Sequence, residues 1–436
     1  MLGFSMINLV RRHPHKMDIE LRNTFVNLYH PFRLVPCFLH SFWENVLKKT
    51  KKYSVIIEFH DDQEEFNSKV ITANSIITTH IRSEIKHHYP SVHSCSATLT
   101  PAAIESLLEG YPAIKKIHTD REVHALLDVA RSSVKANAPT IKDVSGKGVT
   151  IAVIDTGIYA HKDLAGKIKA FKDLTGNKTA PFDDNGHGTH CAGDAAGNGT
   201  ASNGKYKGLA PEADLVGIKV LNRTGSGSLS TVMAGVQWCI DNKMKYNINI
   251  ITMSLGSSAT VSASEDPMVT IVEKAWDQGI VVIVAAGNEG PDEKTISSPG
   301  ISPKVITVGA MDDKNTVERV GDQVADFSSR GPTIDGLIKP DILCPGVNII
   351  SLRSPNSYLD KLNKANRVNT AYFSLSGTSM ATPICAGVAA LILQAHPALT
   401  PDQVKQRLLA SAENWDLPLN VQGKGYNDAE KAVIMP

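Results

Sequence analysis

The residue whose surroundings could best support chemistry is Ser379, in the stretch Ser376-Gly377-Thr378-Ser379-Met380-Ala381-Thr382-Pro383. The run 384–393 that follows is apolar on every side and uncharged, so we expect a helix enclosed by protein. A helix beginning at Ser379 places its hydroxyl beside backbone N–H groups without helical partners, where a developing oxyanion is readily stabilised. Pro383 has no N–H, which leaves the Ser379 carbonyl without its usual partner. The competing interpretation is a hydroxyl that only caps a core helix.

A second candidate is Asp155, which ends an apolar run and opens the triplet Asp155-Thr156-Gly157. Such a triplet is either a turn at the end of a strand or half of the carboxylate pair of an aspartic protease. That pair needs a second triplet, so that two carboxylates can share one proton. The sequence contains no other Asp-Thr-Gly or Asp-Ser-Gly, so this interpretation is dropped.

Two further candidates lie between these residues. His187 stands in Asp183-Asp184-Asn185-Gly186-His187-Gly188-Thr189-His190-Cys191. A zinc site at His187 and His190 is one alternative, but the spacing lacks the helical His-Glu-x-x-His pattern and the glycines disfavour a regular helix. Asn288 follows another apolar run, either as a left-handed turn residue or as an amide donor aimed at an oxyanion.

The elements that must position these residues are predicted by apolar runs. Continuous β-branched runs at 148–154, 215–220, 248–253, 280–285 and 305–308 are typical of strands buried on both faces. Helical stretches, such as 231–242 and 266–278, lie between them. This alternation predicts an α/β fold with a doubly wound, mostly parallel sheet and helices on both faces. In such sheets, sites form at the carboxyl ends of strands, where Asp155 and Asn288 are expected.

The three motifs, in the order Asp, His, Ser, resemble the signatures of the subtilisin-like serine proteases, the subtilases. The resemblance runs from about residue 146 to the C-terminus, and some details suggest the intracellular, alkaline-protease-like branch of the Bacillus type. It implies a serine endopeptidase in which His187 takes the proton of Ser379 and Asp155 holds the imidazole. Asn288 Nδ2 and the Ser379 N–H would bind the oxyanion. Subtilisin is the standard example of this residue order and of an asparagine donor, so these roles are carried over from it.

The resemblance also implies where substrate binds. Two segments would pair with an extended peptide, and main-chain bonds would supply affinity. One pocket, with walls at 285–287 and 296–300, would select the residue before the cut, and because neither wall has an evident acidic residue we expect an apolar or broad preference. The implied substrate-binding residues are Ser254, Leu255, Gly256, Gly225, Ser226, Gly227, Ala285, Ala286 and Gly287.

Some positions depart from the family pattern. Ser376 stands where many members have Asn, and this leaves the three catalytic candidates intact. The segment 197–206, where many subtilisins bind structural calcium, is longer and differently composed, so a structural calcium ion is expected without a placed site. No catalytic cofactor is implied. Cys191 resembles the thiol of some family members, and it is otherwise a small buried apolar residue.

The N-terminal third is predicted to be separate from this domain. Residues 1–52 hold nine Lys or Arg against three Asp or Glu and are expected to be a basic helical extension with its apolar side packed on the next domain; an anionic partner is the alternative. Residues 53–127 read as a small α+β unit, with strands at 53–59, 92–99 and 114–118 and helix at 64–88 and 102–108. They resemble, more weakly, the inhibitory propeptide of the family. Residues 123–127 would then lie in the substrate cleft, with cleavage near Leu126 or Leu127; an ordinary accessory domain is the alternative.

Composition limits the partners. The 45 basic and 44 acidic residues nearly balance, so bulk charge gives no case for nucleic acid or an anionic membrane. Charged residues interrupt the first thirty positions and the six cysteines are scattered, which favours a reduced cytoplasmic location without a signal peptide. The predicted organisation is 1–52 extension, 53–127 propeptide-like domain, 128–145 linker and 146–436 peptidase domain. The rival function is a catalytically silent peptide-binding module on the same fold.

Overall fold

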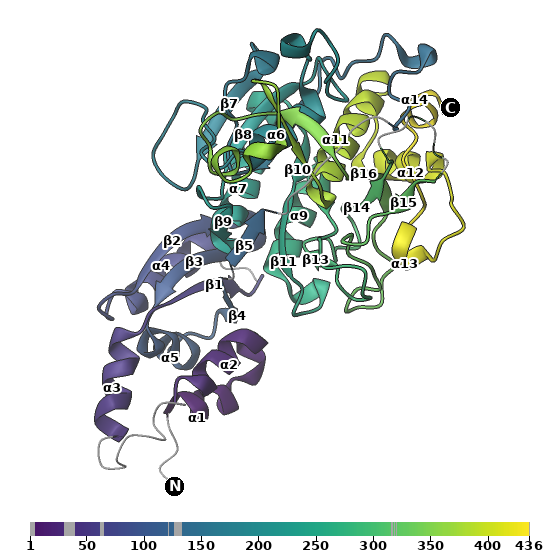
Figure 1. Ribbon diagram of the computed structural model, residues 1–436. Coiled ribbons are helices and arrows are strands. Elements are labelled where there is room, and N and C mark those ends of the chain that lie inside the picture. Colours follow the sequence, from purple (N-terminus) through teal and green to yellow (C-terminus); the bar gives the residue numbers. More distant parts are fainter. Residues whose placement is uncertain are drawn as a thin grey trace. The chain divides into compact units, whose positions relative to one another are not determined.

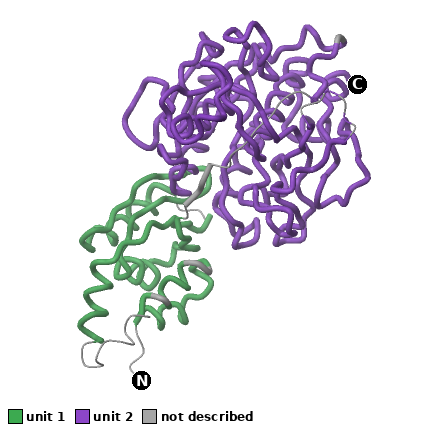
Figure 2. The backbone as a smooth tube through the Cα atoms, in the orientation of Figure 1, with its two compact units in different colours: residues 1–121 green, residues 122–436 purple. Residues whose placement is uncertain are grey.

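The computed structural model describes residues 5–29, 40–61, 65–120, 122–125, 133–314, 317, 319 and 321–435. The chain divides into two compact units, residues 1–121 and 122–436 (Figure 2). The boundaries predicted at residues 52, 127 and 145 remain predictions, because 126–132 lie outside the described residues.

The first unit is built on an antiparallel sheet with the order β2-β3-β1-β4. Its elements alternate as a split β-α-β layout: β1 (Tyr53–Phe59), α4 (Phe66–Ile77), β2 (Glu84–Tyr89), β3 (Ser94–Leu99), α5 (Pro101–Gly110) and β4 (Ile114–Thr119). Thr100 caps α5 by accepting a hydrogen bond from Ala103 N–H, and Pro101 follows it at the start of the helix. The helix predicted over 64–88 is wrong at its end, because exposure alternates along Glu84–Tyr89 as it does in a strand with one buried face.

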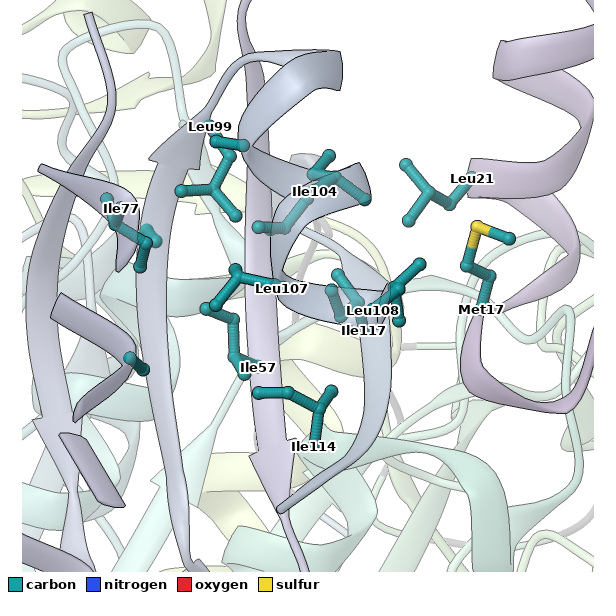
Figure 3. Close-up of a cluster of buried hydrophobic side chains, with 14 of the residues drawn as sticks. Met17, Leu21, Ile57, Ile77, Leu99, Ile104, Leu107, Leu108, Ile114 and Ile117 are labelled. Atoms are coloured by element: carbon teal, nitrogen blue, oxygen red, sulfur yellow. The ribbon is translucent and has the colours of Figure 1, made fainter. Parts of the chain in front are cut away.

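Three N-terminal helices belong to the same unit: α1 (Ser5–Arg12), α2 (Ile19–Asn27) and α3 (His40–Thr50). Their apolar side chains share one core with the sheet and α5, and Figure 3 shows Met17 and Leu21 facing Ile104 and Leu108. The expected packing of the basic extension through its apolar side is therefore observed for the residues that the structure describes.

The second unit contains the central sheet, in the order β15-β14-β12-β10-β6-β8-β7 with β16 also beside β14. Figure 1 labels β7, β8, β10, β14, β15 and β16 of this sheet. All of these pairs are parallel except β14 with β15. The strands are β6 (Thr150–Asp155), β7 (Ile168–Asp173), β8 (Asp214–Lys219), β10 (Ile248–Met253), β12 (Val281–Ala285), β14 (Ile306–Asp312), β15 (Gln323–Val324) and β16 (Ile342–Pro345). The apolar runs thus predicted the strands to within a few residues.

Helices cover both faces of this sheet. A Cβ at Gly188 of α6 (His187–Ala196) would meet Asp155, whereas one at Gly235 of α7 (Leu229–Asp241) would meet Ile154. Neighbouring residues of a strand point to opposite faces, so α6 and α7 lie on opposite sides of β6. α11 (Thr378–Ala395) packs with α6, and α9 (Pro267–Asp277) packs with α7. The doubly wound arrangement is confirmed.

Smaller elements complete this unit. β5 (Glu122–Ala125), β9 (Ser226–Ser228), β11 (Leu255–Ser258) and β13 (Ser297–Ser298) form one sheet, and β17 (Ile349–Leu352), β18 (Arg367–Val368) and β19 (Tyr372–Leu375) form another. The remaining helices are α8 (Lys243–Tyr246), α10 (Tyr358–Leu362), α12 (Pro401–Ser411), α13 (Leu419–Gln422) and α14 (Ala429–Ile434).

One position in the sheet marks the expected site. β6, the first strand of the sheet in the sequence, lies between β8 and β10, and later strands continue on both sides of it. Ligands of doubly wound sheets bind at such a switch point, beyond the carboxyl ends of the strands. Asp155 is the last residue of β6.

The helix α11 is long and apolar enough to cross a membrane, but 89% of its apolar window is buried inside the protein. It is the core helix predicted from the uncharged run after Ser379.

Candidate active site

Asp155 and His187 form a buried pair at the switch point. Asp155 ends β6 and His187 begins α6, and His187 Nδ1 lies 2.7 Å from Asp155 Oδ1 and 2.9 Å from Oδ2. Thr156 N–H donates to Asp155 Oδ1 at 2.7 Å and holds the carboxylate. This arrangement fixes the hydrogen of the imidazole on Nδ1 and leaves Nε2 as the basic nitrogen.

A buried carboxylate shapes the turn before His187. Asp183 Oδ1 accepts from the N–H groups of Asn185 and Gly186, and Oδ2 accepts from Thr189 N–H and Oγ1. Burial raises the pKa of Asp183 above its ordinary value, although these donors favour its ionised form. The expectation that glycines prevent a regular helix here is wrong, because Gly186 (φ 107°) turns the chain and Asp183 holds the first turn of α6.

Ser379 is the second residue of α11, which begins one residue earlier than expected. Its hydroxyl lies 3.3 Å from the carbonyl oxygen of Ser254, to which it donates. Pro383 lies inside the helix, and the carbonyl oxygen of Ser379 accepts instead from Ser254 Oγ at 2.6 Å. The sequence predicted this orphaned carbonyl but not its side-chain partner.

Cys191 links Ser379 to the Asp155–His187 pair. Its sulfur lies 3.6 Å from the Ser379 carbonyl oxygen and 3.9 and 4.0 Å from His187 Nδ1 and Nε2. The N-terminus of α11 and the imidazole at the start of α6 therefore contact the same thiol. Burial raises the pKa of Cys191 to about 12, so this thiol is neutral, as expected for a small buried apolar residue.

The fourth candidate, Asn288, is oriented by the start of α11. Its Oδ1 accepts from Thr378 N–H at 2.9 Å and from Thr378 Oγ1 at 3.0 Å. Because the amide oxygen is fixed as the acceptor, Nδ2 is the donor end of the side chain. Thr378 thus orients the amide of Asn288, a role that was not predicted from the sequence.

Two opposing influences act on His187. Its burial lowers the pKa, but the nearby Asp155 carboxylate raises it, and the net pKa lies well above the ordinary value of a histidine. The imidazolium is therefore strongly stabilised, as a base that accepts a proton during a reaction requires.

The orientation of His190 argues against a zinc site at His187 and His190. His190 Nδ1 lies 2.9 Å from Asp194 Oδ2, and its Nε2 faces the carbonyl oxygens of Ile349 and Phe373 at 3.2 and 3.1 Å. His190 is thus occupied away from His187. Among the residues that the structure describes, the close group with metal-ligand chemistry is Asp155, His187 and Cys191.

The segments predicted to bind substrate flank a strand of the chain itself. β5 pairs antiparallel with β11, through Leu255 with Ala125 and Gly256 with His124, and with β9, through Ser226 with His124 and Gly227 with Val123. Gly225 and Ser254 directly precede β9 and β11. Backbone groups of the two predicted segments therefore hold an extended peptide between them, as β-augmentation requires.

The two predicted pocket walls also lie together. Ala285 ends β12, Ala286 O accepts from Ser297 N–H at 2.8 Å, and a Cβ at Gly287 would lie 2.5 Å from Ser297 Oγ. Ala286 and Ile296 belong to one small apolar cluster.

Sequence reasoning missed Lys219, at the end of β8. Its ammonium group is buried and donates to Thr156 O, Asp184 Oδ1 and Leu221 O at 2.6, 2.7 and 2.8 Å. Three acceptors satisfy its three hydrogens. The available signal was a lysine within an otherwise apolar run, which is typical of a buried charge with a specific partner.

Comparison with known proteins identifies the family. Residues 146–426 match the model of the subtilase family, Peptidase S8. The chain belongs to the subtilase family. It is 53% identical to the serine protease AprX of Bacillus subtilis over 441 residues, covering 99% of both chains, and 35% identical to subtilisin E of the same species over 336 residues, covering 76% of this chain and 78% of subtilisin E.

Among solved structures, the chain is similar to fervidolysin from Fervidobacterium pennivorans, a keratinolytic enzyme related to subtilisin, with a TM-score of 0.70 and 22% identity. The similarity covers 88% of this chain and 61% of fervidolysin, and it shows the subtilisin-like fold. With its family and its near full-length relative, this subtilase is a serine endopeptidase that acts on proteins, not a silent binding module.

Proposed function

We propose that this subtilase hydrolyses peptide bonds through an acyl-enzyme on Ser379. His187 removes the proton of the Ser379 hydroxyl as its oxygen attacks the substrate carbonyl, then returns that proton to the leaving amine. The bond of 2.7 Å between His187 Nδ1 and Asp155 carries this proposal, because it directs the basic Nε2 away from the carboxylate. Water then attacks the acyl-enzyme by the same steps and releases the carboxylate product.

Asn288 Nδ2 and the Ser379 N–H are the proposed donors to the oxyanion. The hydrogen bonds from Thr378 to Asn288 Oδ1 support this role, because they fix the amide before substrate arrives. Preorganised donors stabilise the charge of the transition state without reorganisation.

Hydrolysis of casein tests the nucleophile. Wild-type enzyme should hydrolyse casein, and a serine-directed organophosphonate should stop it. Ser379→Ala should reduce hydrolysis to the background of the buffer. Casein hydrolysis by Ser379→Ala at the wild-type rate would refute the proposal.

The proposed substrates bind as an extended strand between residues 225–227 and 254–256. The pairing of β5 with β9 and β11 supports this mode, since these strands already accept a peptide backbone on both sides. Ala285, Ala286 and Gly287, opposite Ser297, would accept the residue before the cut, and their small uncharged surfaces support the apolar or broad preference.

We further propose that residues before the peptidase domain inhibit it. β5 follows the first unit directly in sequence and occupies the strand position that substrate would use. Residues 126 and 127, where cleavage is expected, lie outside the described residues. Residues 1–127, added as a separate fragment, should inhibit a chain that begins at Val129. No inhibition at micromolar excess would support an accessory domain instead.

A structural calcium ion, a cytoplasmic location and the absence of nucleic-acid or membrane partners also remain proposals. The carboxylate bonded to segment 197–206 is Asp163, whose Oδ1 and Oδ2 accept from Ala201 N–H and Tyr372 Oη at 2.7 Å each, so this donor set fits calcium poorly. A structural calcium ion at another position stays a proposal, and faster thermal inactivation in a chelator would support it. A cytoplasmic location and the absence of nucleic-acid or membrane partners can be tested by cell fractionation.

A further inference from the structure

The segment 353–367 contacts the turn that precedes His187. Three consecutive carbonyl oxygens of this turn accept hydrogen bonds from it: Asp183 O from Ser354 Oγ at 2.7 Å, Asp184 O from Tyr358 N–H at 2.8 Å and Asn185 O from Leu359 N–H at 3.0 Å. Two of these donors are the first N–H groups of α10, which have no partner within their own helix.

A buried aspartate fixes α10 in this orientation. Arg353 donates to Asp360 through Nε at 2.5 Å and Nη2 at 2.9 Å, and Arg367 donates to the same carboxylate through Nε at 2.7 Å. Asn356 N–H adds a fourth bond to Asp360 Oδ2 at 2.9 Å. Burial alone would raise the pKa of Asp360, but the bonds from the two arginines lower it to about 2, so Asp360 is ionised at neutral and alkaline pH.

The same turn is held from its other side. Lys219 binds the Asp184 carboxylate at 2.7 Å, and Asn185 Nδ2 donates to Arg223 O at 2.9 Å. Asn185 Oδ1 in turn accepts from His187 N–H at 3.1 Å. The turn 183–186 is thus fixed between α10 and the loop after β8, and its last bond reaches the main chain of His187.

The contact is also close. A Cβ at Gly186 would lie 2.7 Å from Ser357 Oγ, so the residue next to His187 packs directly on the cap of α10. A shift of α10 would therefore reach the turn before His187 through two hydrogen bonds and one packed contact.

We propose that Asp360, with Arg353 and Arg367, is a positioning residue for His187. This inference rests on the proposed role of His187 as the base. When the carboxylate is lost, α10 should no longer hold the turn, and the imidazole should spend less time in reach of Ser379. The carboxylate of Asp360 is bonded to Arg353, Asn356 and Arg367, and not to β9 or β11, where substrate is proposed to bind, so the chemical step should suffer more than binding.

Steady-state kinetics of Asp360→Asn on a chromogenic peptide tests this proposal. The substitution keeps the shape and removes the charge that both arginines bind. We expect kcat to fall about tenfold or more, because small misplacements of a catalytic group are costly, and KM to change less than twofold. Asp277→Asn, which removes the exposed ion pair with Lys304, is the matched control and should leave both parameters unchanged.

The kinetic constants of Asp360→Asn distinguish a positioning role of Asp360 from a role in protein stability alone. A folded Asp360→Asn with wild-type kcat, or with a raised KM and unchanged kcat, would overturn it. If Asp360→Asn does not fold, Arg367→Gln, which removes one partly exposed arginine, must show the same fall in kcat, and a wild-type kcat in this variant would also overturn the proposal. Ser379→Ala, measured in parallel, tests the proposed function independently.

Discussion

At the scale of single residues, the candidate catalytic side chains are held in place by hydrogen bonds from neighbouring residues that take no part in the reaction. Thr378 binds the amide oxygen of Asn288, and Thr156 N–H binds the Asp155 carboxylate. Each bond sets the direction of a side chain whose chemistry depends on direction. Catalytic power in this subtilase should therefore depend on neutral neighbours as well as on the proposed triad.

Replacement of Asn288, the proposed oxyanion donor, should lower the catalytic rate and not the affinity for substrate. In subtilisin, the reference case for this donor, its loss costs about 3 kcal/mol, or 10²–10³-fold in kcat. We expect a loss of this order in Asn288→Ala, with little change in KM, measured on a chromogenic peptide. Thr378→Val, which removes only one of the two bonds to Asn288, should lose less. An increase confined to KM would assign Asn288 to substrate binding.

The pH dependence follows from the charge beside His187. Catalysis needs the neutral imidazole, and the Asp155 carboxylate raises the pKa of His187 above its ordinary value near 6.5. The rise of kcat/KM with pH should therefore have its midpoint above 6.5 and reach an alkaline plateau. In Asp155→Asn, the midpoint of the rise of residual kcat/KM with pH should shift to a lower pH. An optimum near pH 4 would contradict the account.

At the scale of elements, the site depends on two buried helices that start at its edge. α6 begins at His187 and α11 begins beside Ser379, and they pack against each other. Their close approach uses glycine, because a Cβ at Gly387 of α11 would lie 3.1 Å from Ala195 O of α6 and would clash with Leu209 Cβ in the loop after α6.

Gly387→Ala should destabilise the peptidase domain. Overpacking costs roughly 1–3 kcal/mol, which should outweigh the gain of about 1 kcal/mol from replacing a helical glycine. Urea unfolding followed by circular dichroism measures the change. Gly110→Ala is the control, since no atom lies within 4 Å of its added Cβ, and it should not lose stability. Equal stability of Gly387→Ala and wild type would show that α6 and the loop at Leu209 can move away from α11 at little cost in free energy.

The elements differed in how far the sequence could predict them. Strands buried on both faces, such as β10 and β12, were predictable, because a short continuous apolar run is typical of a buried strand. The start of α6 was not, since its glycine-rich sequence has poor helix propensity and the helix is set by Asp183 and by packing. The segment 353–367 was also missed, because its polar sequence has no periodicity and its contacts are distant in the chain.

The residues of the candidate site also differ in whether they could be predicted from the sequence. Asp155, His187, Ser379 and Asn288 were identified through a resemblance, and their positions at one edge of the sheet follow from topology. The roles of Thr378 and Lys219 could not be predicted, because one threonine or lysine has no distinctive spacing. Their importance appears only when their partners are known.

At the scale of the whole molecule, the chain combines a protease with a first unit that precedes it. If this unit is an inhibitory propeptide, the enzyme should process itself. The mass of the purified wild-type protein should decrease by cleavage near Leu127, and Ser379→Ala should keep its full length. Processing of Ser379→Ala in a protease-deficient host would attribute the cleavage to another enzyme.

Activation of Ser379 by His187 is the step on which catalysis depends, and covalent labelling of the Ser379 hydroxyl measures it. Wild-type and His187→Ala proteins are exposed to a serine-directed organophosphonate at alkaline pH. Each protein is then digested, and the mass of the peptide that contains Ser379 is measured by mass spectrometry. We expect a phosphonylated peptide in the wild type and none in His187→Ala. Equal labelling of both proteins, or a label on another serine, would contradict this expectation.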